Sequence, residues 1–147
     1  MPALAGVTSV AHVIQLAVAP VFLLTGVGAL LSVLINRLGR VVDRFRALER
    51  ALPEARDQAL ASARKEMTIL ERRARLIHWA IGFCTGCALL VCVVIATLFV
   101  GAITETQLPM LIAVLFIAAM LSLVAGLLCF LREIALATGN IHVMPPA

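Results

Sequence analysis

Polar side chains recur along one face of the apolar segment near the N-terminus. They belong to a seam of alternating three- and four-residue spacings, completed by Val18, Phe22 and Ala29, which places them on a single helical face. Polar groups inside a bilayer are costly unless they are paired or hydrated, so this face is expected to contact protein or a water-filled cavity. Two interpretations stay open: hydrogen bonds to neighbouring helices, or the lining of a pore. The residues of this candidate polar stripe are Gln15, Thr25, Ser32 and Asn36.

A pore would require several copies of the chain with the first helix innermost. Three helices packed together fill their own interior, so one chain cannot surround water, whereas rings of side chains from several copies line a channel. The pore hypothesis therefore predicts a homo-oligomer.

Basic residues cluster between the first apolar segment and the next one. Eleven of the twelve Lys and Arg residues lie between Arg37 and Arg75. Basic clusters beside membrane helices fix topology and attract anionic lipid, and guanidinium groups pair well with phosphate. Binding of a cytoplasmic anionic ligand or partner protein is the alternative. The candidate lipid- or partner-binding residues are Arg37, Arg40, Arg44, Arg72, Arg73 and Arg75.

The remaining reactive residue types form no catalytic or metal-binding pattern. Cys84 and Cys87 spell CxxC, but at helical spacing in an apolar run, which favours buried small side chains. Asp43 and Asp57 both lie in the basic segment, where they cannot serve intramembrane hydrolysis. No phosphate-binding or dinucleotide-binding Gly-rich motif is present. We therefore expect no enzyme activity, no catalytic residue, no cofactor, no metal and no nucleic-acid partner.

Composition and apolar run lengths predict the elements that position these residues. The chain of 147 residues is 63% hydrophobic, against roughly 45–50% apolar residues in soluble domains, and its mean hydropathy is +1.09. Crossing a bilayer takes about 20 helical residues. We predict one all-α integral membrane domain with membrane helices at residues 10–36, 76–103 and 108–131. The first run exceeds the usual core of a signal peptide, about 7–15 residues, and has no basic region before it, so we expect it to be retained.

The basic segment, residues 37–75, is predicted to form an antiparallel helical hairpin. Apolar residues recur there at heptad spacing on both sides of Pro53, so the first two helices are expected to continue past the membrane and pair. Glu133, beside Arg132, predicts an ion pair at the membrane interface, and Pro20 predicts a bend or local unwinding. The two heptad seams are Leu38, Val41, Phe45, Leu48 and Leu52, and Leu60, Ala63, Met67, Leu70, Ala74 and Ile77.

Small residues on the last two helices predict close helix packing. Residues with small side chains at a spacing of four let helix backbones approach closely in lipid. They are Gly82 and Gly86 on one helix and Ala118, Ser122 and Gly126 on the other.

Several blocks of the chain resemble a bacterial membrane family catalogued as domain of unknown function 2721. The blocks are residues 13–31, Asn36-Arg37, Val42-Asp43-Arg44, residues 89–102 and residues 115–138. The resemblance runs from about residue 10 to about residue 138. It implies three membrane helices with a basic insertion between the first two, and it implies no activity or site.

Together these patterns predict a multi-pass protein of the bacterial inner membrane. Loops rich in Lys and Arg stay cytoplasmic, which places the N-terminus outside and the tail, residues 132–147, in the cytoplasm. The favoured hypothesis is a homo-oligomeric, non-enzymatic module with an ion-conducting pore lined by the first helix. The alternative is a scaffold or regulatory subunit whose basic hairpin binds anionic lipid or a partner protein.

Overall fold

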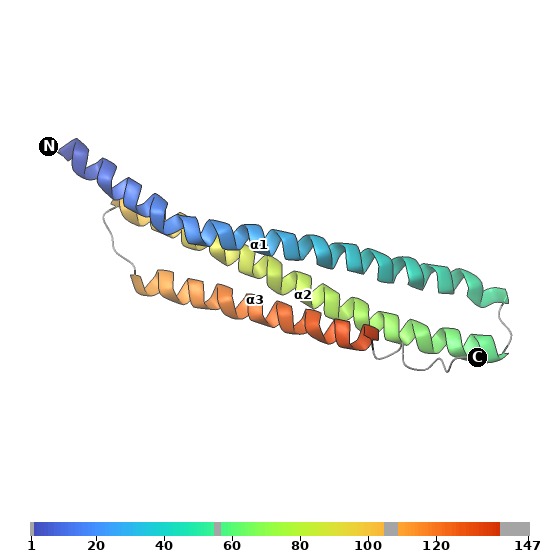
Figure 1. Cartoon of the computed structure of the whole chain (residues 1–147). Helices are drawn as coiled ribbons and strands as arrows, with labels where there is room; N and C mark the ends of the chain where they lie inside the picture. Colours follow the sequence, from blue (N-terminus) through green and yellow to red (C-terminus); the bar gives the residue numbers. More distant parts are fainter. Residues whose placement is uncertain (1, 55–56, 105–108, 139–147) are drawn as a thin grey trace. The chain divides into compact units, whose positions relative to one another are not determined.

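The computed structural model describes residues 2–54, 57–104 and 109–138, with side-chain surroundings from Ala11 onward except at Glu54. Over these residues the chain is helical: α1 spans Pro2–Ala51, the short 3-10 helix η1 spans Leu52–Glu54, α2 spans Asp57–Thr104 and α3 spans Pro109–Thr138 (Figure 1). Each α-helix is long and apolar enough to cross a bilayer. The predicted all-α class with three such helices is confirmed, and the chain is a multi-pass membrane protein.

The helices extend beyond the apolar segments that define them in the sequence. α1 continues to Ala51, α2 begins at Asp57, and α3 continues to Thr138, so the start of the predicted tail is helical. Residues 139–147 lie outside the described part of the chain. Pro109 is the first residue of α3, a position where its missing N–H leaves no helical hydrogen bond unmade.

Pro20 does not interrupt α1. A bend or local unwinding was predicted at this buried residue, and the unwinding is not found, because the helix is continuous through it. A proline already has the φ angle of a helix and removes one backbone donor, which a long helix can absorb without unwinding.

The chain divides into two compact units, and the first comprises Met1–Leu31 with Phe83–Val124. In this unit Ser122 Oγ of α3 donates a 2.8 Å hydrogen bond to the Phe83 carbonyl of α2. A Cβ at Gly86 would lie 3.4 Å from the same hydroxyl oxygen. The predicted close packing of small residues is therefore found at Gly86 and Ser122, and it is not found at Gly82, where an added Cβ would meet nothing within 4 Å. The buried apolar residues of this unit are Ala17, Val27, Cys84, Cys87, Val91, Val94 and Ala119.

The second unit comprises Ser32–Gly82 with Ala125–Ala147. Its two predicted heptad seams are buried or half-buried at every position, and Val41, Leu70 and Ile77 are the most buried of them. Outside these seams, the Arg44 guanidinium of α1 donates to the Glu66 carboxylate of α2 at 2.7 and 3.3 Å. The end of α1 and the start of α2 therefore lie side by side.

Candidate functional site

Glu133 of α3 is fully buried and shared by two arginines of the second unit. Arg73 of α2 donates from Nε and Nη2 to Glu133 Oε1, at 3.1 and 2.8 Å. Arg37 Nη2 of α1 lies 3.0 Å from Oε2. The Glu133 side chain is 0% exposed, against 24% for Arg37 and 23% for Arg73. A carboxylate removed from water in this way requires compensating cations.

The sequence pointed to the wrong partner for Glu133. Arg132 is exposed, because successive residues of a helix point about 100° apart, and the ion pairs are made with Arg37 and Arg73 instead. Glu133 is the one acidic residue of α3, so the sequence could indicate that its partners come from the basic segment but not which arginines they are.

The two oxygens of the Glu133 carboxylate are in different environments. Oε1 accepts both hydrogen bonds from Arg73, whereas Oε2 has no hydrogen-bond partner among the described residues, since Arg37 approaches it outside hydrogen-bond geometry. The Arg37 guanidinium also lies over the Phe130 ring of α3, 5.3 Å from its centroid, a cation–π contact. Arg37 is thus held by attraction to two groups of α3.

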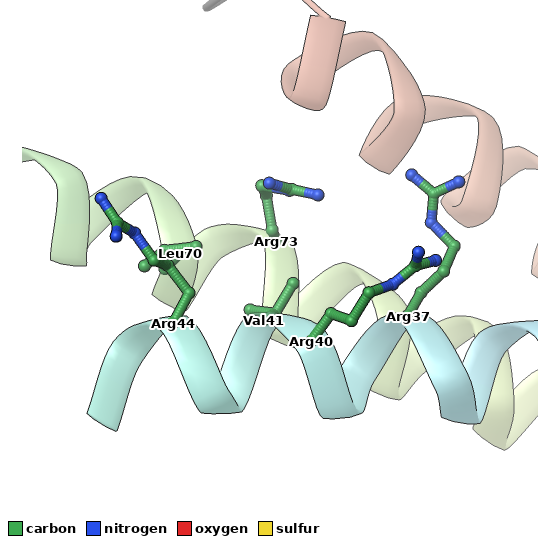
Figure 2. A pocket seen from close by; sticks show the side chains of 6 residues that line it. All are labelled: Arg37, Arg40, Val41, Arg44, Leu70 and Arg73. Atoms are coloured by element: carbon green, nitrogen blue, oxygen red, sulfur yellow. The ribbon is translucent and has the colours of Figure 1, made fainter. Parts of the chain in front are cut away.

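Beside this ion-pair cluster is a pocket of about 400 Å³ that we call the arginine pocket. Four of its lining residues have the spacing of one face of α1, and two come from one face of α2 (Figure 2). Figure 2 shows the guanidinium of Arg37 reaching toward α3. The lining residues are Arg37, Arg40, Val41 and Arg44 of α1 and Leu70 and Arg73 of α2.

Positive charge is in excess around the arginine pocket. Four guanidinium groups line it, and the carboxylates that pair with them are Glu133 and Glu66, which leaves two positive charges uncompensated. Glu66 raises the pKa of Arg44, mainly through the hydrogen bond and then through charge attraction, so Arg44 stays cationic. Arg40 has no ion pair within the described residues. Such a site can accept an anion.

The six predicted arginines therefore separate into two groups. Arg37, Arg40, Arg44 and Arg73 meet around the pocket, whereas the exposed Arg72 and Arg75 do not line it. The reason is helical geometry, because neighbours of Arg73 in sequence point to other sides of α2.

The candidate polar stripe of α1 faces outward from the chain. In the first unit Gln15 and Thr25 are exposed, and Thr25 Oγ1 donates to the Val21 carbonyl of its own helix at 3.3 Å. In the second unit Ser32 and Asn36 are exposed as well. The remaining members of the same face, Val18, Phe22 and Ala29, are also exposed. Within the described chain, no other helix covers this face.

Cysteine and other ligand side chains form no cluster in the part of the chain that the structure describes. No group of three His, Cys, Asp or Glu residues there could hold a metal ion. Cys84 and Cys87 are free thiols buried in the first unit, where they pack as small side chains.

Comparison with known proteins identifies one family. A family model described as "Protein of unknown function (DUF2721)" matches residues 17–143. This match confirms the resemblance drawn from the blocks of the sequence. No curated protein and no solved structure matches the chain.

Proposed function

The chain belongs to the DUF2721 family, proteins of unknown function, and we propose that it is a non-enzymatic membrane module that assembles as a homo-oligomer with an ion-conducting pore lined by α1. The observation that carries the proposal is the outward-facing polar stripe. Gln15, Thr25, Ser32 and Asn36 are exposed along one face of a helix that is apolar enough to cross a bilayer.

Lipid is a poor environment for this stripe. Thr25 donates its hydroxyl to the Val21 carbonyl of its own helix, but an amide such as that of Gln15 or Asn36 has several donors and acceptors that hydrocarbon cannot satisfy, which is why such groups usually face protein or water. Hydrogen bonds between membrane helices contribute only about 0.6 kcal/mol each on average. Hydrogen bonds between copies of the chain therefore explain poorly why four polar residues lie on one face of α1. Several copies with α1 innermost would hydrate all four.

The proposed topology puts the C-terminal part of α1 and the N-terminal part of α2 in the cytoplasm as an antiparallel helical hairpin. The Arg44–Glu66 ion pair and the buried seams support this pairing. Eleven of the twelve Lys and Arg residues lie between Arg37 and Arg75, and the positive-inside rule then places the N-terminus outside and the C-terminus inside the bacterial inner membrane.

Oligomeric mass is the first test of the pore. Light scattering on the purified full-length protein, corrected for bound detergent, should give one species of four or more chains. A monomer would overturn the proposal, because the three helices of a single chain cannot surround water.

Ion flux through the reconstituted protein is the second test. Thr25→Leu or Ser32→Leu should abolish flux in proteoliposomes, because each replaces a hydroxyl of the stripe by an apolar side chain. Thr85→Leu is the matched control, since Thr85 is an exposed threonine on α2 outside the stripe. Flux that survives both stripe variants, or that falls equally in the control, would contradict a pore lined by α1.

The second candidate function is a scaffold or regulatory subunit whose basic hairpin binds anionic lipid or a partner protein. The excess positive charge of the arginine pocket favours it. Reversing Arg40 and Arg44 to Glu should abolish such binding and spare flux, whereas the stripe variants should do the opposite.

A further inference from the structure

We propose that the arginine pocket binds the phosphate group of a phosphate ester, and that Arg40 supplies the positive charge that is not already paired with a carboxylate. This site deepens the second candidate function and depends on it, but it does not depend on the pore.

The guanidinium groups of the pocket differ in how far they are already paired. Arg73 uses Nε and Nη2 for Glu133, and Arg44 uses Nε and Nη2 for Glu66. Arg40 has no ion pair among the described residues. Each guanidinium carries five N–H donors, so the paired arginines also retain donors for a ligand. Arginine donates two parallel hydrogen bonds to a phosphate, which makes it the suited residue for this ligand.

Glu133 and Glu66 hold arginine side chains of the pocket in place without neutralising its positive charge. Each carboxylate holds one or two arginines through ion pairs of 2.7 to 3.0 Å. Four like charges lining one pocket repel one another, and two carboxylates leave an excess of two positive charges. A phosphate ester carries one or two negative charges, which would balance that excess.

The walls of the pocket favour an ester over a free inorganic anion. Val41 and Leu70 contribute buried apolar surface between the arginines. The volume of about 400 Å³ lies within the range of small-molecule pockets, roughly 300–1,000 Å³. A phosphate with a short carbon substituent would place its oxygens on the guanidiniums and its carbons on Val41 and Leu70.

Membrane topology alone does not explain this arrangement. The positive-inside rule depends on the number of basic residues near the helix ends and is indifferent to the helix face that carries them. Arg72 and Arg75 meet that requirement from exposed positions. Arg37, Arg40 and Arg44 instead share one face of α1 and face the same pocket as Arg73.

Two sources could supply the phosphate ester: the headgroup of an anionic lipid or a soluble phosphate monoester. The test uses the purified full-length protein in neutral detergent, titrated with short-chain phosphatidylglycerol in one arm and glycerol 3-phosphate in the other. Short-chain diacylglycerol, which has the same acyl chains and no phosphate, is the control for acyl chain contact. Saturable binding of phosphatidylglycerol alone would identify a lipid headgroup, and saturable binding of glycerol 3-phosphate would identify a soluble ester. Either result supports the site.

Arg40→Gln should weaken binding by about tenfold or more, the loss expected when a hydrogen bond between charged groups is removed. Arg40→Lys should recover part of the affinity, because it restores the charge but not the planar pair of donors. The matched control is Arg72→Gln, which removes an exposed charge outside the pocket. Arg40 is the suitable position, since it has no ion pair within the described residues whose loss would disturb the fold.

Three outcomes would overturn the proposed site. Equal weakening by Arg40→Gln and Arg72→Gln would show general attraction to a basic surface, in which case the second candidate function survives and the specific pocket does not. Diacylglycerol binding as tight as phosphatidylglycerol binding would show acyl chain contact alone. The absence of saturable binding in both arms would remove the site and the lipid form of the second candidate together. The ion flux and the oligomeric mass of the Arg40→Gln variant should equal those of the wild type. The tests of the pore therefore give their results independently of the test of the phosphate site.

Discussion

Glu133 links three helices of the second unit through a single carboxylate. Its partners Arg37 and Arg73 come from α1 and α2, and both are only about a quarter exposed. Removing one member of a buried ion pair is far more costly than the net contribution of the pair, because the remaining charge loses its compensation. The neutralisation of Glu133 should therefore destabilise the fold.

Glu133→Gln keeps the size of the side chain and removes its charge. We expect the free energy of unfolding to fall by about 3 kcal/mol, the lower end for breaking a buried pair, because both arginines retain some access to water. Denaturant titration in detergent, followed by circular dichroism, measures the loss. Glu71→Gln is the control, since Glu71 is an exposed carboxylate on α2. Equal stability of the two variants would show that the Glu133 cluster contributes nothing to the fold.

The site could be predicted in part at the level of single residues. The arginines were identifiable from their clustering, and the polar stripe from its spacing. The partners of Glu133 were not, because Arg73 is 60 positions away along the chain. Attraction between opposite charges selects no particular arginine among eleven basic residues of one segment. Only the packing of α3 against the other helices makes that choice.

At the scale of elements, periodicity predicted where the helices and their seams lie. It did not predict what each face of a helix contacts. The apolar runs predicted three long helices, and the heptad positions from Leu38 to Ile77 are all at least half-buried. Spacing assigned Gln15, Thr25, Ser32 and Asn36 to one face of α1. It could not establish whether that face points toward α2 and α3 or away from them, since both arrangements have the same period.

The contact between α2 and α3 in the first unit gives a prediction for two glycines. A side chain at Gly86 would meet the Ser122 hydroxyl at 3.4 Å, whereas a Cβ at Gly82 would meet nothing within 4 Å. Gly86→Leu should lower the free energy of unfolding by about 1–3 kcal/mol through overpacking. Gly82→Leu should be neutral or stabilising by up to about 1 kcal/mol, because glycine is a poor helix former.

Thermal unfolding of both glycine variants in the same detergent tests the contact. A Gly86→Leu variant as stable as Gly82→Leu would contradict close packing at Ser122. A loss of stability in Ser122→Ala would separately show the value of its hydrogen bond to the Phe83 carbonyl, expected at about 1 kcal/mol.

At the scale of the whole molecule, the Lys and Arg residues are concentrated in one segment of the chain. Arg132 is the one Lys or Arg residue outside the segment from Arg37 to Arg75. Both the arginine pocket and the Glu133 cluster belong to the second unit, and Gln15 and Thr25 of the stripe belong to the first. Under the proposed topology, lipid or ligand binding would lie on one side of the membrane, and the proposed conduction path would run across it.

Protease access to membrane vesicles tests this orientation. Trypsin should cleave the protein in inside-out vesicles and leave residues 37–75 intact in right-side-out vesicles, because the proposed topology puts these residues in the cytoplasm. The earliest cuts should fall at Arg50, in the last turn of α1, and at the nearby Arg56. Trypsin cuts within a helix only after local unfolding, which is easiest at helix ends and rarest where the seams are packed. Cleavage in right-side-out vesicles would reverse the topology, and equally early cuts from Arg40 to Arg72 would contradict the paired helices. The same digestion of Glu133→Gln should expose Arg73 earlier than in the wild type, because that arginine then lacks the carboxylate that holds it against α3.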